Sequence, residues 1–185
     1  MRKIIFSINT TIDGFADHTA GIADAELHDF FADFLVDIDV VLLGRKTYEM
    51  MADYWPHAAE DPRSTKSEIR FADKYNAVPK IVFSKTLKEV NWNNTRLSKG
   101  NMIEEVLKLR QSPSGGSKNI AAGSLSIASA LAEKNLIDEY WFLFHPVILG
   151  KGKQLLEGLN NKINLKLIET KNFGSGVIAA HYEKT

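Results

Sequence analysis

Short apolar runs alternate with helical patterns along the first 149 residues, and this alternation limits the fold more than any other feature of the sequence. The run from Val40 to Leu43 is continuously apolar, as expected of a strand that is buried on both faces of a sheet. A helical pattern follows it from Thr47 to Ala52. Because strands that alternate with helices favour a parallel sheet covered by helices on both faces, we predict a three-layer αβα fold of the α/β class.

Apolar spacing, together with cap and turn residues, sets the expected elements. Residues 24–37 have helical spacing, with Asp24 as a good N-cap. Further helices are expected at 47–52, 67–75, 101–111 and 124–134, and strands at 3–8, 40–43, 80–84, 96–97, 119–122 and 139–149. Residues 53–67, which contain two prolines, look irregular, and the SPSGGS stretch at 112–117 is predicted to be a flexible loop.

Two more expected strands, at 163–172 and 176–183, are joined by a Phe-Gly-Ser-Gly turn. Glycines supply the unusual backbone angles of a tight turn, so these strands are predicted to form a hairpin. The hairpin would add an antiparallel edge to a mostly parallel central sheet. The proline and glycine stretches between elements are too short to be linkers, and we therefore predict that residues 1–185 form a single domain.

The composition excludes several classes of site and partner. The 185 residues include 23 Lys and Arg and 23 Asp and Glu, so the formal net charge is zero and no basic footprint for nucleic acid is visible. The absence of cysteine excludes disulfides, thiolate nucleophiles and cysteine zinc sites in this sequence, and the histidines show no metal-ligand spacing. No apolar stretch is long enough to span a membrane, and no signal peptide is recognised. We expect a soluble, cytoplasmic protein with no metal, nucleic-acid or membrane partner.

Three expected strand ends carry residues that suit anions. Open α/β sheets bind ligands beyond the carboxyl ends of their strands, where glycine admits a close ligand and helix N-termini attract negative charge. Each strand end alone can be a tight turn, a solvated surface or a cap, but their coincidence favours a ligand with several phosphates, such as a dinucleotide. No G-x-G-x-x-G motif is present, so a standard Rossmann site is not expected. The candidate cofactor-binding residues are Gly44, Arg45, Lys46, Thr47, Ser84, Lys85, Gly123, Ser124 and Leu125.

These motifs make the chain resemble the dihydrofolate reductase-like superfamily. It is most similar to the branch that contains the reductase domain of the bifunctional riboflavin-biosynthesis deaminase/reductase. The Gly-Arg-Lys-Thr-Tyr-Glu stretch at 44–49 resembles the family's G-R-x-T-x-E and is the most specific match. Further matches are the first strand with its S-x-D-G-like turn at 7–14, the I-V-x-S strand at 81–84, the glycine turn at 122–124, the D-E ending at 136–139 and the P-V ending at 146–152.

The resemblance implies an NADPH-dependent reductase, in which the three strand ends hold the cofactor. Gly44, Arg45 and Thr47 would hold the pyrophosphate and the side that carries the 2′-phosphate. Ser84 and Lys85 would flank the adenosine ribose with its 2′-phosphate, and the turn at 123–125 would cover the pyrophosphate from the other side. A homodimer is also suggested by the resemblance and permitted by the neutral charge.

The substrate and the catalytic residues are less defined by the sequence. Asn9 and Asp13, at the end of the first strand, and Trp55, which could stack on a flat heterocycle or anchor a loop, are the candidate substrate residues. The acid that folate-reducing enzymes carry on the first helix falls on His28, so Asp29 and Asp13 are the remaining candidate acids, each open to a purely structural interpretation. His145, in an apolar run, is interpreted as a core or pocket histidine with satisfied hydrogen bonds rather than as a metal ligand.

The functional prediction that follows is hydride transfer from NADPH to a small planar N-heterocycle, either pterin-like or pyrimidine-like. The riboflavin-pathway reaction, reduction of 5-amino-6-(5-phosphoribosylamino)uracil, is one form of it. The region after the second strand contains Tyr54, Trp55 and Pro56 and looks more like an aromatic lid than a site for a ribose phosphate. The alternatives are a nucleotide-binding protein of the same fold that lacks the reaction and, less well supported, a purely structural subunit.

Overall fold

The computed structural model describes residues 1–112 and 118–185, and its strands form one eight-stranded sheet in the order β4-β3-β2-β5-β1-β6-β8-β7. The predicted loop at 112–117 lies, apart from Ser112, outside the described residues. The strands are β1 (Ile4–Thr11), β2 (Ile38–Gly44), β3 (Lys80–Phe83), β4 (Thr95–Ser98), β5 (Asn119–Ala122), β6 (Glu139–His145), β7 (Leu165–Asn172) and β8 (Ile178–Lys184).

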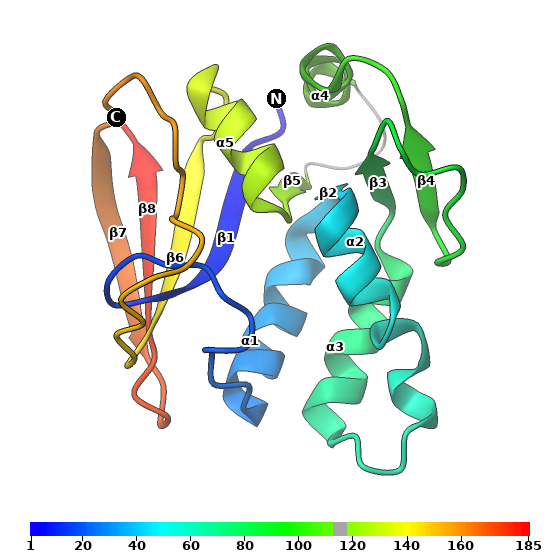
Figure 1. Cartoon of the computed structure of the whole chain (residues 1–185), viewed down its shortest axis with the longest axis vertical. Coiled ribbons are helices and arrows are strands. Elements are labelled where there is room, and N and C mark those ends of the chain that lie inside the picture. Colours follow the sequence, from blue (N-terminus) through cyan, green and yellow to red (C-terminus); the bar gives the residue numbers. More distant parts are fainter. Residues whose placement is uncertain (113–117) are drawn as a thin grey trace.

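The sheet is parallel over most of its width. Every neighbouring pair from β4 across to β6 runs parallel, whereas β8 pairs antiparallel with both β6 and β7. Figure 1 shows the β7–β8 hairpin at one edge and β4 at the other. This arrangement confirms the predicted α/β fold with an antiparallel C-terminal hairpin.

Helices cover both faces of the sheet. The helices are α1 (Ala25–Phe34), α2 (Arg45–Ala52), α3 (Lys66–Ala77), α4 (Met102–Gln111) and α5 (Leu125–Glu133), with 3-10 turns η1 (Leu35–Asp37) and η2 (Trp55–Glu60). Alternate residues of β2 enter two separate cores: Leu42 packs in the cluster that includes α4 and α5, and Leu43 packs in the cluster that includes α1, α2 and α3. Helices α1 and α3 lie side by side on their face (Figure 1).

Several predicted boundaries differ from the structure, and for two of them the backbone makes the reason clear. Helix α2 begins at Arg45 rather than at Thr47, because Gly44 itself takes the extended N-cap conformation, with φ −87° and ψ 161°. Strand β6 ends at His145 rather than at 149, because its pairing with β8 stops at Phe144 and a tight turn follows, in which the N–H of Val147 donates to the carbonyl of His145.

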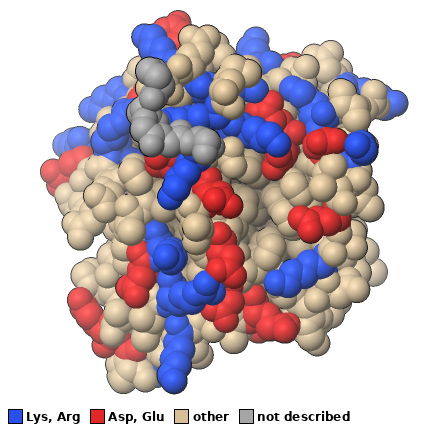
Figure 2. Space-filling model, turned by 180° about the vertical axis from the view of Figure 1, so that it is seen from behind, with Lys and Arg blue, Asp and Glu red and all other residues tan. Residues whose placement is uncertain are grey.

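The surface of the described residues carries both signs of charge. Figure 2 shows Lys and Arg interspersed with Asp and Glu over most of one face. Some of these charges are paired across elements, as where Arg70 of α3 contacts both Asp29 and Asp33 of α1. Among the helices of residues 1–112 and 118–185, none combines the length and apolar composition that crossing a membrane requires.

Candidate active site

The strand order brings the three predicted anion-friendly strand ends together. Strands β3, β2 and β5 are consecutive neighbours in the sheet, and Gly44 pairs with Phe83 while Leu42 pairs with Ala122. All three strands are parallel, so their carboxyl ends meet at one edge of the sheet. The carboxyl ends of β4, on one side, and of β1 and β6, on the other, extend the same row.

The N-terminus of α2 lies directly against β5. Gly44 is buried, and its N–H donates to the hydroxyl oxygen of Ser124 over 2.8 Å. A Cβ atom at Gly44 would lie 2.8 Å from the hydroxyl oxygen of Ser126, so the side chain of Ser126 lies close against this glycine. As N-cap of α2, Gly44 has no side chain to accept a hydrogen bond from the first turn of the helix.

The N-terminus of α5 has the same property for a different reason. Ser124 is its N-cap, but the hydroxyl accepts from Gly44 and makes no capping hydrogen bond. The helices α1, α3 and α4, in contrast, are capped by the side chains of Asp24, Thr65 and Asn101. The two helices whose first-turn N–H groups lack a side-chain partner in the described structure therefore begin beside each other, between β2 and β5. Converging N–H groups and helix dipoles of this kind bind anions.

Gly123 and Leu125, which flank Ser124, contribute mainly to packing. A Cβ atom at Gly123 would lie 2.9 Å from side-chain atoms of Val41 and Leu43 and 3.3 Å from the carbonyl oxygen of Leu42. Leu125, the first residue of α5, packs partly buried against the core. The small residue at 123 thus lets α5 begin close to β2, which brings its N-terminus to Gly44.

The predicted cations of α2 are available to a ligand. Arg45 and Lys46 are exposed, and Thr47 is half-buried. The guanidinium of Arg45 contacts the carboxylate of Glu49 at 3.4 Å, with both side chains nearly half exposed. An exposed pair of this kind contributes at most about 1 kcal/mol, so it does not prevent Arg45 from binding a phosphate group.

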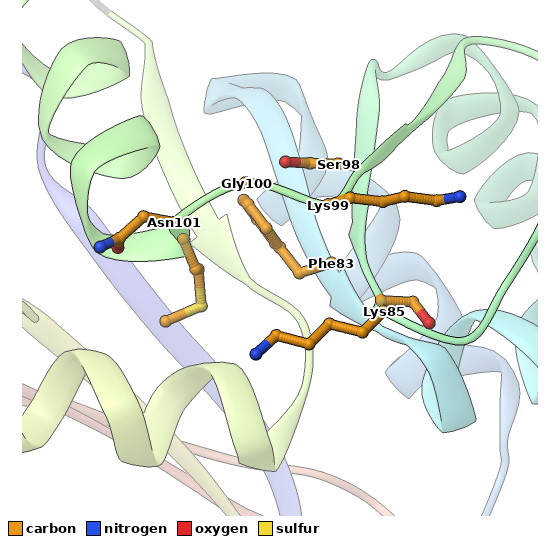
Figure 3. A pocket seen from close by; sticks show the side chains of 8 residues that line it. Phe83, Lys85, Ser98, Lys99, Gly100 and Asn101 are labelled. Atoms are coloured by element: carbon orange, nitrogen blue, oxygen red, sulfur yellow. The ribbon is translucent and has the colours of Figure 1, made fainter.

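Next to the N-terminus of α2, a cavity of about 590 Å³ opens at the carboxyl ends of β3 and β4 (Figure 3). Ser84 and Lys85, which were predicted from the sequence, line one side, and the hydroxyl of Ser84 accepts from the N–H groups of Thr86 and Leu87. In Figure 3 the side chain of Lys85 extends across the cavity below Phe83. The other side is lined by Ser98, Lys99, Gly100, Asn101 and Met102.

The β4 side of this cavity was missed from the sequence. Strand β4 is a short edge strand, of which only 96–97 was predicted, and no local pattern shows which strand it pairs with. The one available signal was the Lys99-Gly100-Asn101 stretch, a cation and a glycine before a helix cap, which resembles the other strand ends. Both lysines line the cavity, and in Figure 3 their side chains extend in opposite directions, with that of Lys85 lying below Phe83.

At the ends of β1 and β6, Asn9 is bound to His145. The Oδ1 atom of Asn9 lies 3.1 Å from Nε2 of His145, and the N–H of Ile22 donates to Nδ1 over 2.9 Å. His145 is only 2% exposed, and burial lowers its pKa below the ordinary value. Both ring nitrogens are thus satisfied, as the sequence predicted for this histidine. The histidine also holds the loop that follows β1 against the sheet.

Asp13 joins two loops. Its carboxylate accepts hydrogen bonds from the hydroxyl of Thr11 at 2.6 Å and from the N–H groups of Leu149 and Gly150, the shortest at 2.7 Å. These hydrogen bonds, of which the one from Thr11 has the largest effect, lower the pKa of Asp13 to about 2. The group is therefore ionised at neutral pH, which suits an anchor for the loop after β6 better than a proton donor.

Asp29 and Trp55 are engaged in packing between elements. Asp29 accepts from the guanidinium of Arg70 and the hydroxyl of Ser67, and these hydrogen bonds lower its pKa. The Trp55 ring lies 4.6 Å from that of Phe71 and 5.7 Å from that of His28, measured between centroids. In this arrangement Trp55 anchors η2 against α1 and α3.

Comparison with known proteins identifies the family. The model of the RibD C-terminal domain matches residues 2–179. The chain belongs to the RibD C-terminal domain family. The relative YyaP of Bacillus subtilis (strain 168), an uncharacterized protein, is 35% identical over 184 residues, which is 98% of this chain and 94% of YyaP.

Solved structures agree on the fold. A protein from Shewanella sp. PV-4, whose name provisionally assigns it to riboflavin biosynthesis, has a TM-score of 0.73 at 19% identity, covering 100% of this chain and 99% of its own. Dihydrofolate reductase from Enterococcus faecalis, solved with NADP(H) and the ligand RAB-propyl, has a TM-score of 0.64 at 11% identity, covering 99% of this chain and 96% of its own. Family and fold together support a reductase-type function.

Proposed function

We propose that the protein is an NADPH-dependent reductase that transfers hydride to a small planar N-heterocycle. The observation that carries this proposal is the meeting of two helix N-termini without side-chain caps, at the hydrogen bond between Gly44 and Ser124, beside a cavity framed by lysines. A pyrophosphate matches the first feature, because its oxygens accept from converging N–H groups. A phosphorylated ribose matches the second, because the ammonium group of Lys85, which extends across the cavity, would offset its charge.

The row of strand ends has a length that suits an extended dinucleotide. Three strand spacings separate β3 from β1, which corresponds to about 14 Å at roughly 4.8 Å per spacing. With the pyrophosphate near Gly44, the adenosine end would occupy the cavity near Lys85 and the nicotinamide would reach the end of β1, near Asn9. The cofactor supplies the hydride, and the chain's own residues orient it and exclude water.

Family membership supports the proposed reductase function, and the pyrimidine reduction of riboflavin biosynthesis is one form of this function. A second candidate function is nucleotide binding without reduction. The engagement of Asp13 and Asp29 in other hydrogen bonds favours this alternative, because neither carboxyl group is then a ready proton donor. The two functions share the cofactor site and differ only in turnover.

The cofactor site is tested by replacing Lys85 with methionine. The variant Lys85→Met keeps the length of the side chain and removes the charge, so NADPH affinity should fall by about tenfold or more, in line with roughly 1.5–3 kcal/mol for a hydrogen bond to a charged group. NADH affinity should change much less, since NADH lacks the 2′-phosphate. Lys88→Met is the matched control, because Lys88 is exposed on the same segment but does not line the cavity.

Turnover is tested by following the absorbance of NADPH with a panel of pterins and ribosylaminopyrimidines. Oxidation of NADPH that depends on one of these compounds supports the reductase. Tight NADPH binding with no turnover across the panel favours the binding protein. If Lys85→Met and Lys88→Met bind NADPH equally well, the cavity is not the site of the 2′-phosphate.

A further inference from the structure

The hydrogen bonds of His145 determine which of its ring nitrogens carries the proton. A backbone N–H can only donate, so the bond from Ile22 requires a lone pair on Nδ1. The ring is buried, which favours the neutral form. In the neutral ring, a free lone pair on Nδ1 places the proton on Nε2.

This tautomer in turn fixes the orientation of the Asn9 amide. The Nε2–H group of His145 donates, so the atom of Asn9 that faces it at 3.1 Å must be the carbonyl oxygen Oδ1. The alternative orientation would set two donors against each other. The amide NH2 group of Asn9 therefore points away from His145.

The NH2 group of Asn9 has no hydrogen-bond partner among residues 1–112 and 118–185, and Asn9 is exposed. It lies on the face of β1 that carries Ile5 and Ser7, the same face that α1 covers. The hydroxyl oxygen of Ser7, one step earlier on this face, is buried and also lacks a partner in the described structure. The buried Ser7 hydroxyl is out of reach of a ligand, whereas the NH2 group of Asn9 is exposed, is held in one orientation by His145 and lies at the carboxyl end of the sheet, where a polar ligand can accept from it.

We propose that His145 positions the Asn9 amide so that its NH2 group donates to a ring carbonyl oxygen of the substrate, and that this contact selects oxo-heterocycles over amino-heterocycles. This inference rests on the proposed function, which identifies the ligand as a heterocyclic substrate. Asn9 is the residue that contacts the ligand, and His145 is a positioning residue. The selection follows because an amino group opposite the Asn9 NH2 group would leave both donors unpaired.

The test uses two probes of nearly equal shape. Aminouracil presents two ring carbonyls, and in triaminopyrimidine amino groups replace both. We expect the wild-type protein, with NADP+ bound, to prefer aminouracil by about tenfold or more, in line with roughly 1–3 kcal/mol for an unsatisfied polar group. Asn9→Asp replaces the donor by an acceptor of the same shape and should reverse the preference. Asn172→Asp, the same change at an exposed position of β7, is the control and should not alter it.

The positioning role of His145 is tested by two further variants. Gln can donate one N–H to Asn9 and accept from Ile22, so His145→Gln should retain the preference for aminouracil, whereas His145→Phe should lose most of it. Melting temperatures show whether each variant folds. The inference is overturned if Asn9→Asp leaves the preference unchanged, or if wild type binds neither probe at millimolar concentration. A different result would be that NADPH does not bind, while Asn9→Asp still reverses the preference when the probes are titrated without cofactor. That result would contradict only the proposed cofactor.

Discussion

Two glycines at adjoining strand ends should respond to the same substitution in opposite ways. In Gly44→Ala, the backbone angles of φ −87° and ψ 161° are open to alanine, and the new methyl group would clash only with the hydroxyl of Ser126 at 2.8 Å, since its contacts with Ser124 at 3.8 Å are ordinary. Ser126 is exposed and can rotate away, so the free energy of unfolding should change by less than about 1 kcal/mol. The methyl group would nevertheless crowd the phosphate that we propose binds at the N-terminus of α2.

In Gly123→Ala, the methyl group would lie 2.9 Å from side-chain atoms of Val41 and Leu43, with the carbonyl oxygen of Leu42 at 3.3 Å behind them. Both side chains belong to packed strand residues, so relief requires movement of the core. Overpacking of this kind costs about 1–3 kcal/mol, which corresponds to a fall in melting temperature of roughly 2–12 °C for a chain of this size.

The assay combines unfolding by urea with NADPH titration of each variant. We expect Gly44→Ala to remain stable and to bind NADPH at least about tenfold more weakly, because it loses hydrogen bonds from helix N–H groups to a charged ligand. Gly123→Ala should lose stability first, with weaker binding as a consequence. The reasoning is refuted if Gly44→Ala binds NADPH as wild type does, or if both variants lose stability equally.

Three other substitutions test individual contacts. Asp13→Asn should lower the melting temperature at neutral pH, and the difference from wild type should shrink as pH falls from about 4 towards 2, because a pKa depressed in the folded state stabilises only while the group is ionised. Lys80 is buried, its Nζ atom donates to the carbonyls of Tyr75 and Val78 at 2.8 Å, and burial lowers its pKa from 10.5 to about 8. The unfolded chain therefore binds this proton more tightly, and the unfolding free energy of wild type relative to Lys80→Met, measured by urea denaturation, should rise between pH 8 and 10.5. Trp55→Ala should cost about 2 kcal/mol of stability through lost contact with Phe71 and leave NADPH affinity unchanged; weaker NADPH binding in a folded variant would contradict this.

Local patterns were enough to predict the strand, glycine and helix at which we propose that the cofactor binds. The apolar run of β2, the glycine after it and the helix that follows are contiguous in sequence, and parallel strands necessarily end at one edge. That the three strand ends lie side by side depends on the order of the strands, which makes β3, β2 and β5 neighbours. The homodimer and the individual site residues stay predictions.

Contacts between distant segments could not be predicted. Asp13 bonds to the backbone of Leu149 and Gly150, and no local signal couples a carboxylate to N–H groups so far along the chain. The same holds for Lys99, which reaches the cavity because the edge strand β4 pairs with β3. The tautomer of His145 depends on the backbone of Ile22, which the sequence gives no means of placing.

The central claim is that the row of strand ends binds NADPH through its phosphates. It is tested most directly by titrating the wild-type protein with NADPH and, in parallel, with NADH, and following tryptophan fluorescence. The account predicts saturable binding of NADPH with at least about a tenfold preference over NADH, because a charged hydrogen bond to the 2′-phosphate contributes roughly 1.5–3 kcal/mol. Equal binding of the two would contradict the role of Lys85 and the cavity, and binding of neither would contradict the reductase itself.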